Sequence, residues 1–541
     1  MGHSENPHSI EPCVTQAFVS KAAIDAILAP KLKGLFFSGP NQKSNSTAEG
    51  IVVQGISLPD KKGFYKEICP FLGESITMDR LEAIRQKIIR YYKSNDFPVV
   101  GVFIPDGQDI SAGNVHFIIL EGRLEKIEAS GARWFSNQKI ADKIRTKPGE
   151  TIQWTRMHSD LEWINTNPFY KTTLVFEPGE TLGETNVQLL TEDQFPLRTF
   201  AGYENTGNII AGPSRYLTGF NWGNAFGLNH QLNGLFFTAP SIDKCWGAVG
   251  GYIMPLPWRN ILQVNGAYTR ARPNIGEGLD MNGIAWQALG RYWVPFYTLN
   301  LNHQIAVGYD FKRTNNFLNF ANTLIFSHFI DVSQFVLEYE GILANSISNT
   351  SFNLTFYLSP GGMTPYNKDP FFAQDRPGAT SNYIYGKLRL DEILYFPRNW
   401  TWVFNGLFQQ ATGKLLPSEE LSLGGFATVR GYEENEAIGD NGLLVKNELR
   451  TPPIKFPTIK KWRHELQFLG FSDFGWSYDV DQTILSTDTI FLASLGAGVR
   501  YNFGTYVAIR FDYGWQLHTI HRLENPSNFH SRGHFGGTIA F

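Results

Sequence analysis

The segment 505-TYVAIRFDYGW-515 decides the fold class of this chain. Every second residue from Val507 to Trp515 is apolar or aromatic, whereas the residues between them include Arg510 and Asp512. Alternate side chains of a strand point to opposite faces, so one face of this segment suits lipid and the other suits a wet lumen. The pattern therefore predicts a strand of a transmembrane antiparallel β-barrel.

The same alternation continues through residues 197–541 and ends in a run from Phe535 to the terminal Phe541. We expect about sixteen strands, at about 22 residues for each strand with its connection. They are expected near Leu197, Arg215, His230, Trp246, Ile261, Ile284, His303, Ile330, Phe352, Tyr383, Thr401, Leu443, His464, Ile490, Thr505 and Gly533. A β-sandwich or propeller is the soluble alternative, but it needs a second apolar face to bury the outward residues, and these segments offer none.

The composition fits a β-rich protein and excludes several other classes. Aromatic residues make up 14% of the 541 residues and charged residues only 18%. No apolar run approaches the roughly 20 residues that a membrane helix needs, so any crossing must use a closed barrel. A formal net charge of −3 gives no general basis for nucleic-acid binding. Cys13, Cys69 and Cys245 show no CxxC spacing, which indicates neither a zinc site nor a disulfide framework.

Residues 1–47 are expected to hold a short amphipathic helix and a linker. Apolar residues from Phe18 to Leu28 lie at mixed helical spacing before Pro30, which ends the pattern. A polar linker is expected to follow, through Pro40 to Ser46. Met1–Cys13 lacks a basic region followed by an apolar core, so we expect no recognisable secretory signal there.

Residues 48–123 and 124–196 are expected to form two small α+β domains with the same order of strand, helix, helix, strand and strand. In the first, these are Ile51–Ile56, Phe64–Leu72, Met78–Ser94, Val99–Ile104 and Val115–Leu120. In the second, they are Leu124–Ala129, Asn137–Arg145, Thr155–Asn165, Thr172–Phe176 and Asn186–Leu190. Repetition at about 75 residues is stronger evidence than either copy alone. Two generic α+β domains remain the alternative interpretation.

This repeat resembles the POTRA (polypeptide-transport-associated) modules that precede outer-membrane barrels. The junction 120-LEGRLEKI-127 runs directly into the second copy and is similar to the join between the two modules of two-partner secretion translocators. Small α+β domains with exposed sheet edges can accept an extended segment of a partner as an added strand.

The segment 424-GGFATVRGY-432 lies between the eleventh and twelfth expected strands. Strand parity makes residues 415–441 a long loop on the outer side of the barrel, and such a loop can fold back into the lumen. We call residues 415–441 the lumen loop. Arg430 would then need an acidic partner, because a guanidinium removed from bulk water must be paired. On the thirteenth strand the same parity turns Asp473 into the lumen, where the two side chains can form two parallel hydrogen bonds.

These two segments resemble paired motifs of the BamA/TpsB superfamily. Val429, Arg430, Gly431 and Tyr432 match its VRGY tetrad, and 471-FSDFG-475 matches its FxDxG strand motif. The resemblance implies that Phe471, Asp473 and Gly475 receive the lumen loop. It also implies that Phe541, a terminal aromatic on the last strand, is the barrel-assembly signal.

With two POTRA-like repeats ahead of the barrel, the chain resembles a TpsB-type translocator, similar to ShlB and FhaC. The resemblance implies a bacterial outer-membrane protein with periplasmic POTRA domains. They would capture a secreted partner protein by its N-terminal secretion domain, and the partner would be threaded through the barrel. It also implies outer-membrane lipid and the barrel-assembly machinery as partners, and neither catalysis nor a cofactor. The alternatives are a barrel-assembly insertase and a passive pore with periplasmic binding domains.

Two further groups of polar residues are expected to be ordinary surface features. His518, His521, His530 and His534 fall around a predicted loop without a zinc-binding pattern, so we expect polar surface histidines and no metal site. The acidic residues from Glu433 to Asp440 are expected to form a solvated loop.

Overall fold

The computed structural model describes residues 30–40, 49–207, 212–272, 279–298, 301–320, 323–459, 462–480, 489–518 and 530–541. The chain divides into two compact units. One contains Met1–Ser130, Ile144–Met157 and Thr173–Leu190, and the other contains Gly131–Lys143, His158–Thr172 and Thr191–Phe541. The helix expected before Pro30 lies outside the described residues. Among the residues that are described, no helix is long and apolar enough to cross a membrane.

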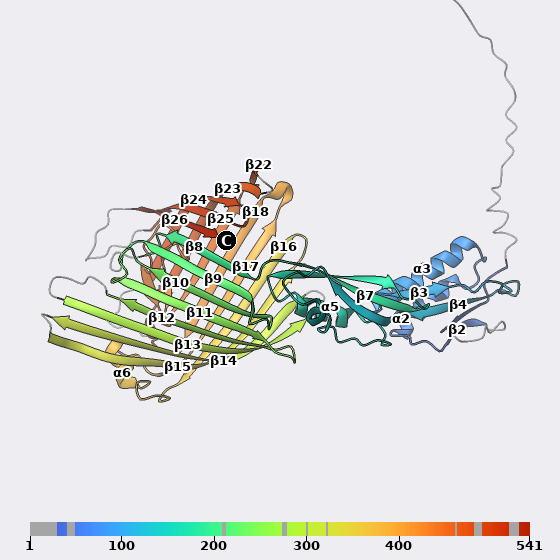
Figure 1. The fold of residues 1–541 in the computed structure, drawn as a ribbon, viewed down its shortest axis with the longest axis horizontal. Coiled ribbons are helices and arrows are strands. Elements are labelled where there is room, and N and C mark those ends of the chain that lie inside the picture. The colour runs from blue at the N-terminus through green and yellow to red at the C-terminus, as the bar shows by residue number, and fades with distance from the viewer. Residues whose placement is uncertain are drawn as a thin grey trace, which may run out of the picture. The chain divides into compact units, whose positions relative to one another are not determined.

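A four-stranded sheet covered by helices forms the first N-terminal domain (Figure 1). Its elements are β1 (Gly34–Ser38), β2 (Gly50–Gln54), α2 (Lys61–Ile68), the 3-10 helix η1 (Cys69–Phe71), α3 (Met78–Ser94), β3 (Val100–Phe103) and β4 (Asn114–Glu121). The strand order is β2-β1-β4-β3. Thr77 caps the N-terminus of α3, because its hydroxyl accepts a hydrogen bond from Arg80 N at 3.3 Å.

The linker expected from Pro30 to Ser46 is wrong for the residues before position 41, and so is the expected start of the first domain at residue 48; residues 41–48 lie outside the described residues. Residues 34–38 form β1, which lies in the middle of the sheet and pairs with both β2 and β4 in parallel. All five of its residues are buried. A central strand covered on both faces has a continuous apolar run, so alternation in the sequence does not indicate it.

The second N-terminal domain has the expected order of elements. They are β5 (Arg123–Ser130), α4 (Asn137–Ala141), α5 (Trp154–Ile164), β6 (Tyr170–Pro178) and β7 (Glu184–Asp193). The strand order is β5-β7-β6, with β5 and β7 parallel. The outer strands β5 and β6 therefore each have one unpaired edge in this sheet.

A closed antiparallel barrel occupies the rest of the chain (Figure 1). Its strands are β8 (Leu197–Glu204), β9 (Arg215–Ala225), β10 (His230–Thr238), β11 (Cys245–Pro255), β12 (Ile261–Ala271), β13 (Leu279–Tyr297), β14 (Asn302–Phe320), β15 (Thr323–Ala344), β16 (Ser348–Pro360), β17 (Asn382–Tyr395), β18 (Thr401–Ala411), β21 (Asn441–Arg450), β23 (Trp462–Tyr478), β24 (Ile490–Phe503), β25 (Val507–Gln516) and β26 (Ser531–Ala540). The barrel closes where β26 pairs with β8. The short β22 (Ile454–Ile459) pairs beside β23, while β21 also pairs with β23 directly. The expected sixteen-stranded barrel is thereby confirmed.

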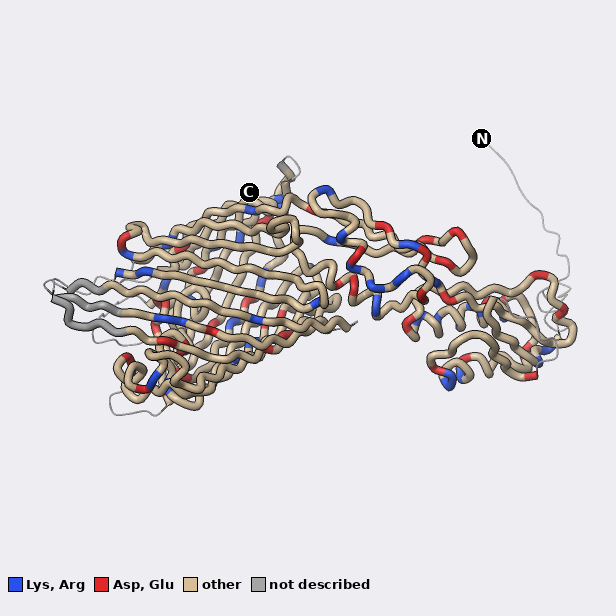
Figure 2. Tube along the Cα trace, turned by 60° about the horizontal axis from the view of Figure 1, so that its bottom comes forward, with Lys and Arg blue, Asp and Glu red and all other residues tan. Residues whose placement is uncertain are grey.

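The two faces of the barrel wall differ as the alternation predicts. On β25, Phe511 and Trp515 are 44% and 52% exposed, whereas Asp512 between them is fully buried. Figure 2 shows that Lys, Arg, Asp and Glu are sparse along the barrel strands that face the viewer. An apolar outer face with polar residues inside suits a wall that contacts lipid.

Candidate functional site in the barrel lumen

The connection between β18 and β21, residues 412–440, contains all but the last residue of the lumen loop. It carries a small two-stranded sheet in which β19 (Leu421–Leu423) pairs with β20 (Ala437–Gly439). At its tip, residues 424–432, Val429 and Tyr432 are 0% and 1% exposed. Both side chains belong to a hydrophobic cluster with Leu444 on β21 and Leu492 on β24, so the loop is folded into the barrel.

Arg430 lies at this tip and is itself 0% exposed. Its Nε and Nη2 donate to the two carboxylate oxygens of Asp473 at 2.7 and 2.8 Å. Its backbone N–H donates to the same carboxylate at 3.1 Å. The structure thus brings the two residues together in the parallel, bidentate arrangement that gives the strongest side-chain hydrogen bonds.

Two further carboxylates approach the same guanidinium. Glu448 accepts from Arg430 Nη1 at 2.6 Å, and Asp512 lies 3.6 Å from that atom. We call Arg430, Asp473, Glu448 and Asp512 the tip cluster. Neither Glu448 nor Asp512 was predicted as a partner from the sequence.

The acidic residues of the tip cluster come from three separate strands. Glu448, Asp473 and Asp512 lie on β21, β23 and β25, and the antiparallel registers turn all three into the lumen. Alternation along each strand would have found Glu448 and Asp512, because both occupy inward positions. Their excess negative charge is balanced by Arg450, 2.6 Å from Glu448, and by Arg500, 3.0 Å from Asp512. Buried charges need this kind of pairing to remain ionised.

The other residues of the strand motif also contact the tip. The Arg430 guanidinium lies 3.6 Å from the centre of the Phe471 ring, within the range of a cation–π contact. A Cβ atom added at Gly475 would lie 2.8 Å from Val429 Cγ2 and 3.1 Å from Leu423 Cδ1. Only glycine leaves room for the loop at that position.

Gly431 and Tyr432 complete the contacts of the tip. The φ angle of Gly431 is +92°, which glycine adopts readily, and its N–H donates to His534 Nε2 at 3.0 Å. The Tyr432 hydroxyl donates to the carbonyl of Ala493 on β24 at 2.9 Å and also bonds the carbonyl of His518. All four residues of the tetrad are therefore buried against the inner wall.

Two expectations from the sequence are wrong here. His534 is not a surface histidine: it lies on β26, points into the lumen and is 1% exposed. The acidic residues after the tetrad are not all solvated, because Asp440 is 0% exposed and Glu434 accepts a hydrogen bond from Phe426 N at 2.9 Å. In both cases the loop folds into the barrel and removes the residue from water. His521 lies outside the described residues.

Phe541 is separate from this cluster. It follows β26 and is 74% exposed. Its backbone N–H and carbonyl pair with Thr199, at 2.8 and 3.2 Å, next to the seam where the barrel closes. The geometry does not connect Phe541 with the tip cluster.

Comparison with known proteins gives one family for this chain. The sequence model of the haemolysin secretion/activation protein ShlB/FhaC/HecB matches residues 183–501. The chain is 22% identical over 470 residues to the outer membrane transporter CdiB of Escherichia coli, covering 83% of this chain and 76% of CdiB. It is 22% identical over 457 residues to the heme/hemopexin transporter protein HuxB of Haemophilus influenzae strain 86-028NP, covering 80% of this chain and 76% of HuxB.

Among solved structures, that of CdiB from Escherichia coli superposes with a TM-score of 0.76 at 16% sequence identity, covering 98% of this chain and 93% of CdiB. This agreement concerns the fold. The family assignment depends on the sequence match, which spans more than half of the chain. The chain belongs to the haemolysin secretion/activation protein family ShlB/FhaC/HecB.

Proposed function

We propose that this protein is an outer-membrane translocator that exports a partner protein through its barrel. The observation that carries the proposal is the combination of a closed barrel with a long loop that is folded into its lumen and whose tip is held by the buried Arg430. Such a loop obstructs the lumen, and it can be released by breaking a few polar contacts. The proposed activity is transport without bond chemistry, so we propose no catalytic residue and no cofactor.

We propose that the two N-terminal domains, formed by β1 to β4 and by β5 to β7, act as POTRA-like domains that capture the N-terminal secretion domain of the partner by strand addition. The supporting features are the unpaired outer edges of the two sheets, which belong to β2 and β3 in the first sheet and to β5 and β6 in the second. A hollow of about 300 Å³ lies beside β3 and the end of β6, lined by Val99, Val100, Phe103, Leu120, Phe176 and Pro178 among others. An unpaired strand edge next to an apolar hollow suits an extended peptide, whose backbone pairs while alternate side chains fill the hollow.

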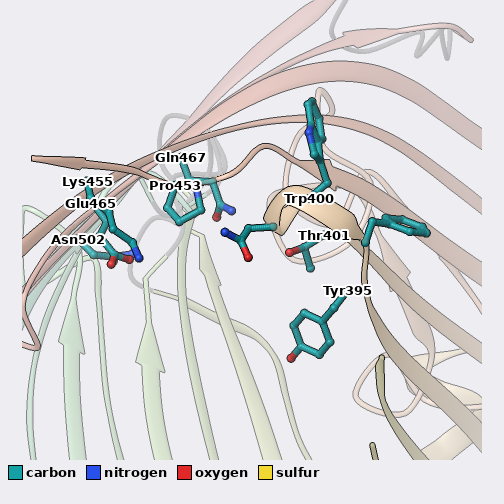
Figure 3. Close-up of a pocket in the computed structure, with 10 residues that line it drawn as sticks. Tyr395, Trp400, Thr401, Pro453, Lys455, Glu465, Gln467 and Asn502 are labelled. Atoms are coloured by element: carbon teal, nitrogen blue, oxygen red, sulfur yellow. The ribbon is translucent and has the colours of Figure 1, made fainter. Parts of the chain in front are cut away.

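A second hollow lies at the end of the barrel wall at which β8 starts and β26 finishes. Figure 3 shows the side chains that line it. This position suits entry of the partner. The hollow measures about 460 Å³ and combines the β17–β18 turn, with Tyr395 and Trp400, with Lys455 and the inward-facing Glu465 and Gln467. Aromatic, charged and amide groups side by side can bind an extended chain of varied sequence weakly, as transport requires.

Within the barrel, we propose that Arg430 and Asp473 fasten the lumen loop in the resting state and separate during export. Val429, Gly431 and Tyr432 would set the position of the tip, and Phe471 and Gly475 would form the surface that receives it. We propose outer-membrane lipid as the surroundings of the apolar outer face. We further propose that Phe541 is read by the barrel-assembly machinery during insertion.

Export assays with Arg430→Ala and Asp473→Ala test this function. We expect secretion of the partner to fall at least tenfold in both variants, while heat-modifiable migration in gels shows that the barrel is assembled. Arg272→Ala is the matched control, because Arg272 follows β12, is exposed and belongs neither to the tip cluster nor to the entry hollow. Full export in both variants would contradict the assigned roles. General loss of other outer-membrane barrels on depletion would instead support an insertase, and small-solute conductance with no effect on any secreted protein would support a passive pore.

A further inference from the structure

The loop between β16 and β17, residues 361–381, packs on the beginning of the lumen loop. It contains the short helix α6 (Asp369–Asp375), whose Phe372 is fully buried. Phe372 belongs to a hydrophobic cluster with Tyr383, Leu415 and Leu416, among others. We call residues 415–420, at the start of the lumen loop, the stem, and residues 361–381 the lid. The lid and the stem therefore share one hydrophobic core.

Arg376, at the end of α6, bonds both ends of the lumen loop. Its Nη1 lies 2.5 Å from Asp440 Oδ1 and 2.6 Å from the carbonyl of Leu415, and its Nη2 lies 3.2 Å from Asp440 Oδ2. It also lies 2.9 Å from Glu420 and 2.9 Å from Asp479. We call Arg376, Asp440, Glu420 and Asp479 the stem cluster.

Asp440 is the central acceptor of the stem cluster and is 0% exposed. Besides Arg376, it accepts the backbone N–H of Leu415 at 2.7 Å and that of Val480 at 2.9 Å. Leu415 lies near the start of the lumen loop, Asp440 lies at its end, and Val480 follows β23. Arg376 and Asp440 thus join the lid, both ends of the lumen loop and the connection after β23.

The stem has a second attachment that does not involve Arg376. The buried carboxylate of Glu419 accepts from Lys312 at 2.7 Å, from Gln334 at 3.0 Å and from the Tyr385 hydroxyl at 2.7 Å. These residues lie on β14, β15 and β17. Because Glu419 would hold the stem to the wall, loss of Arg376 should release the lid and the Asp440 end without detaching the whole loop.

One guanidinium is the shared partner of three carboxylates in the stem cluster. Without it, Asp440, Glu420 and Asp479 would be like charges at close range, and two of the three are buried. The lost hydrogen bonds favour separation of the lid from the stem. The repulsion between Glu420 and Asp440 favours separation of the start of the lumen loop from its end. The stem cluster therefore allows two states: the lid is closed on the stem when Arg376 is bound to its carboxylates, and it is open when Arg376 is released.

We propose that Arg376 is a positioning residue that closes the outer end of the pore by clamping the lid onto the lumen loop. The inference rests on the proposed function as a translocator, but it concerns a different contact from the tip cluster. In the closed state the lid covers the stem. Export then requires two releases, that of Arg376 from Asp440 and that of Arg430 from Asp473.

Conductance of the purified full-length protein in planar bilayers and trypsin cleavage after Lys414 test the proposal. Cleavage there requires the stem to leave its core, because Leu415 and Leu416 are 0% and 4% exposed. We expect Arg376→Gln to raise the frequency of open-channel events and the cleavage rate at least tenfold. Arg376→Lys keeps the charge but cannot span the same acceptors, so we expect an intermediate effect.

Arg389→Gln is the matched control, because Arg389 lies on β17, pairs with Asp391 at 3.2 Å and has a side chain that is 61% exposed. It should behave like the wild type. Asp440→Asn provides a second variant if Arg376→Gln fails to assemble, and it should open the channel as well. Wild-type conductance and cleavage in an assembled Arg376→Gln or Asp440→Asn variant would overturn the proposal, as would Arg376→Lys and Arg376→Gln being equally open. An open channel that exports no partner would count against the proposed function and leave the clamp in place.

Discussion

The tip cluster and the stem cluster have the same composition but different foundations. Each places one arginine among three carboxylates, Arg430 at the tip and Arg376 under the lid. The partners of Arg430 all lie on barrel strands, whose hydrogen-bonded register fixes them. The partners of Arg376 all lie in connections between strands. Arg430 is therefore held by a rigid wall, whereas Arg376 holds connecting loops to one another, and loops are generally more mobile than strands.

The two clusters also differ in burial. The side chain of Arg430 is 1% exposed, whereas that of Arg376 is 16% exposed. A charge shielded from water loses more when its partner is removed, because water cannot replace the missing group. The tip cluster should therefore be the stronger attachment, and the stem cluster the first to open.

The largest expected effect is at the tip. Asp473→Asn removes the charge that pairs with Arg430 and should destabilise the docked tip by about 3–5 kcal/mol, the cost of breaking a buried ion pair. Hydrogen exchange of the backbone N–H groups of residues 424–432 measures this local opening. Combining Asp473→Asn with Arg430→Met should cost less than the sum of the two single changes. Additive costs would show that the two residues are not coupled.

Asp440→Asn should have a smaller effect on the same measurement. Hydrogen bonds to charged groups contribute about 1.5–3 kcal/mol, and the partly exposed Arg376 can recover some solvation. The increase in exchange should be confined to the stem and the lid and leave residues 424–432 protected. Equal loss of protection at the tip would show that the two clusters open as one unit, and the stem cluster would then not be the first to open.

Strand parity explains why one cluster could be predicted and the other could not. Asp473 was assigned to the lumen because side chains alternate along β23, and the same reasoning applies to Glu448 and Asp512. Asp440, Glu420 and Asp479 follow no period, since the path of a connection depends on packing that a sequence does not display. The buried β1 was missed for a related reason, because a strand covered on both faces does not alternate.

The close packing of the tip against Gly475 predicts the next largest loss of tip stability. Gly475→Ala would place a Cβ atom 2.8 Å from Val429, and overpacking of this kind costs about 1–3 kcal/mol. Export and protection of the tip should both decrease, with the stem unchanged. Gly470→Ala is the matched control on the same strand, because the added Cβ would meet only the carbonyl of Gly496, at 4.0 Å. A similar loss in both variants would show that the strand, and not the contact with Val429, is sensitive.

The smallest expected effect separates polar contacts of the tip from its ion pair. Tyr432→Phe removes the hydroxyl that bonds the carbonyls of Ala493 and His518 but keeps the buried ring, so the tip should lose about 1 kcal/mol, a net contribution typical of neutral hydrogen bonds. Protection of residues 424–432 should fall about fivefold, since 1 kcal/mol corresponds to roughly that factor. Tyr478→Phe is the control, because its hydroxyl bonds Gln410 at 3.3 Å in an exposed contact. A loss at Tyr432 as large as that of Asp473→Asn would mean that the tip is held mainly by neutral hydrogen bonds to the wall. The difference in strength between the tip and stem attachments would then come from the neutral groups around Arg430 and Arg376, and not from their ion pairs.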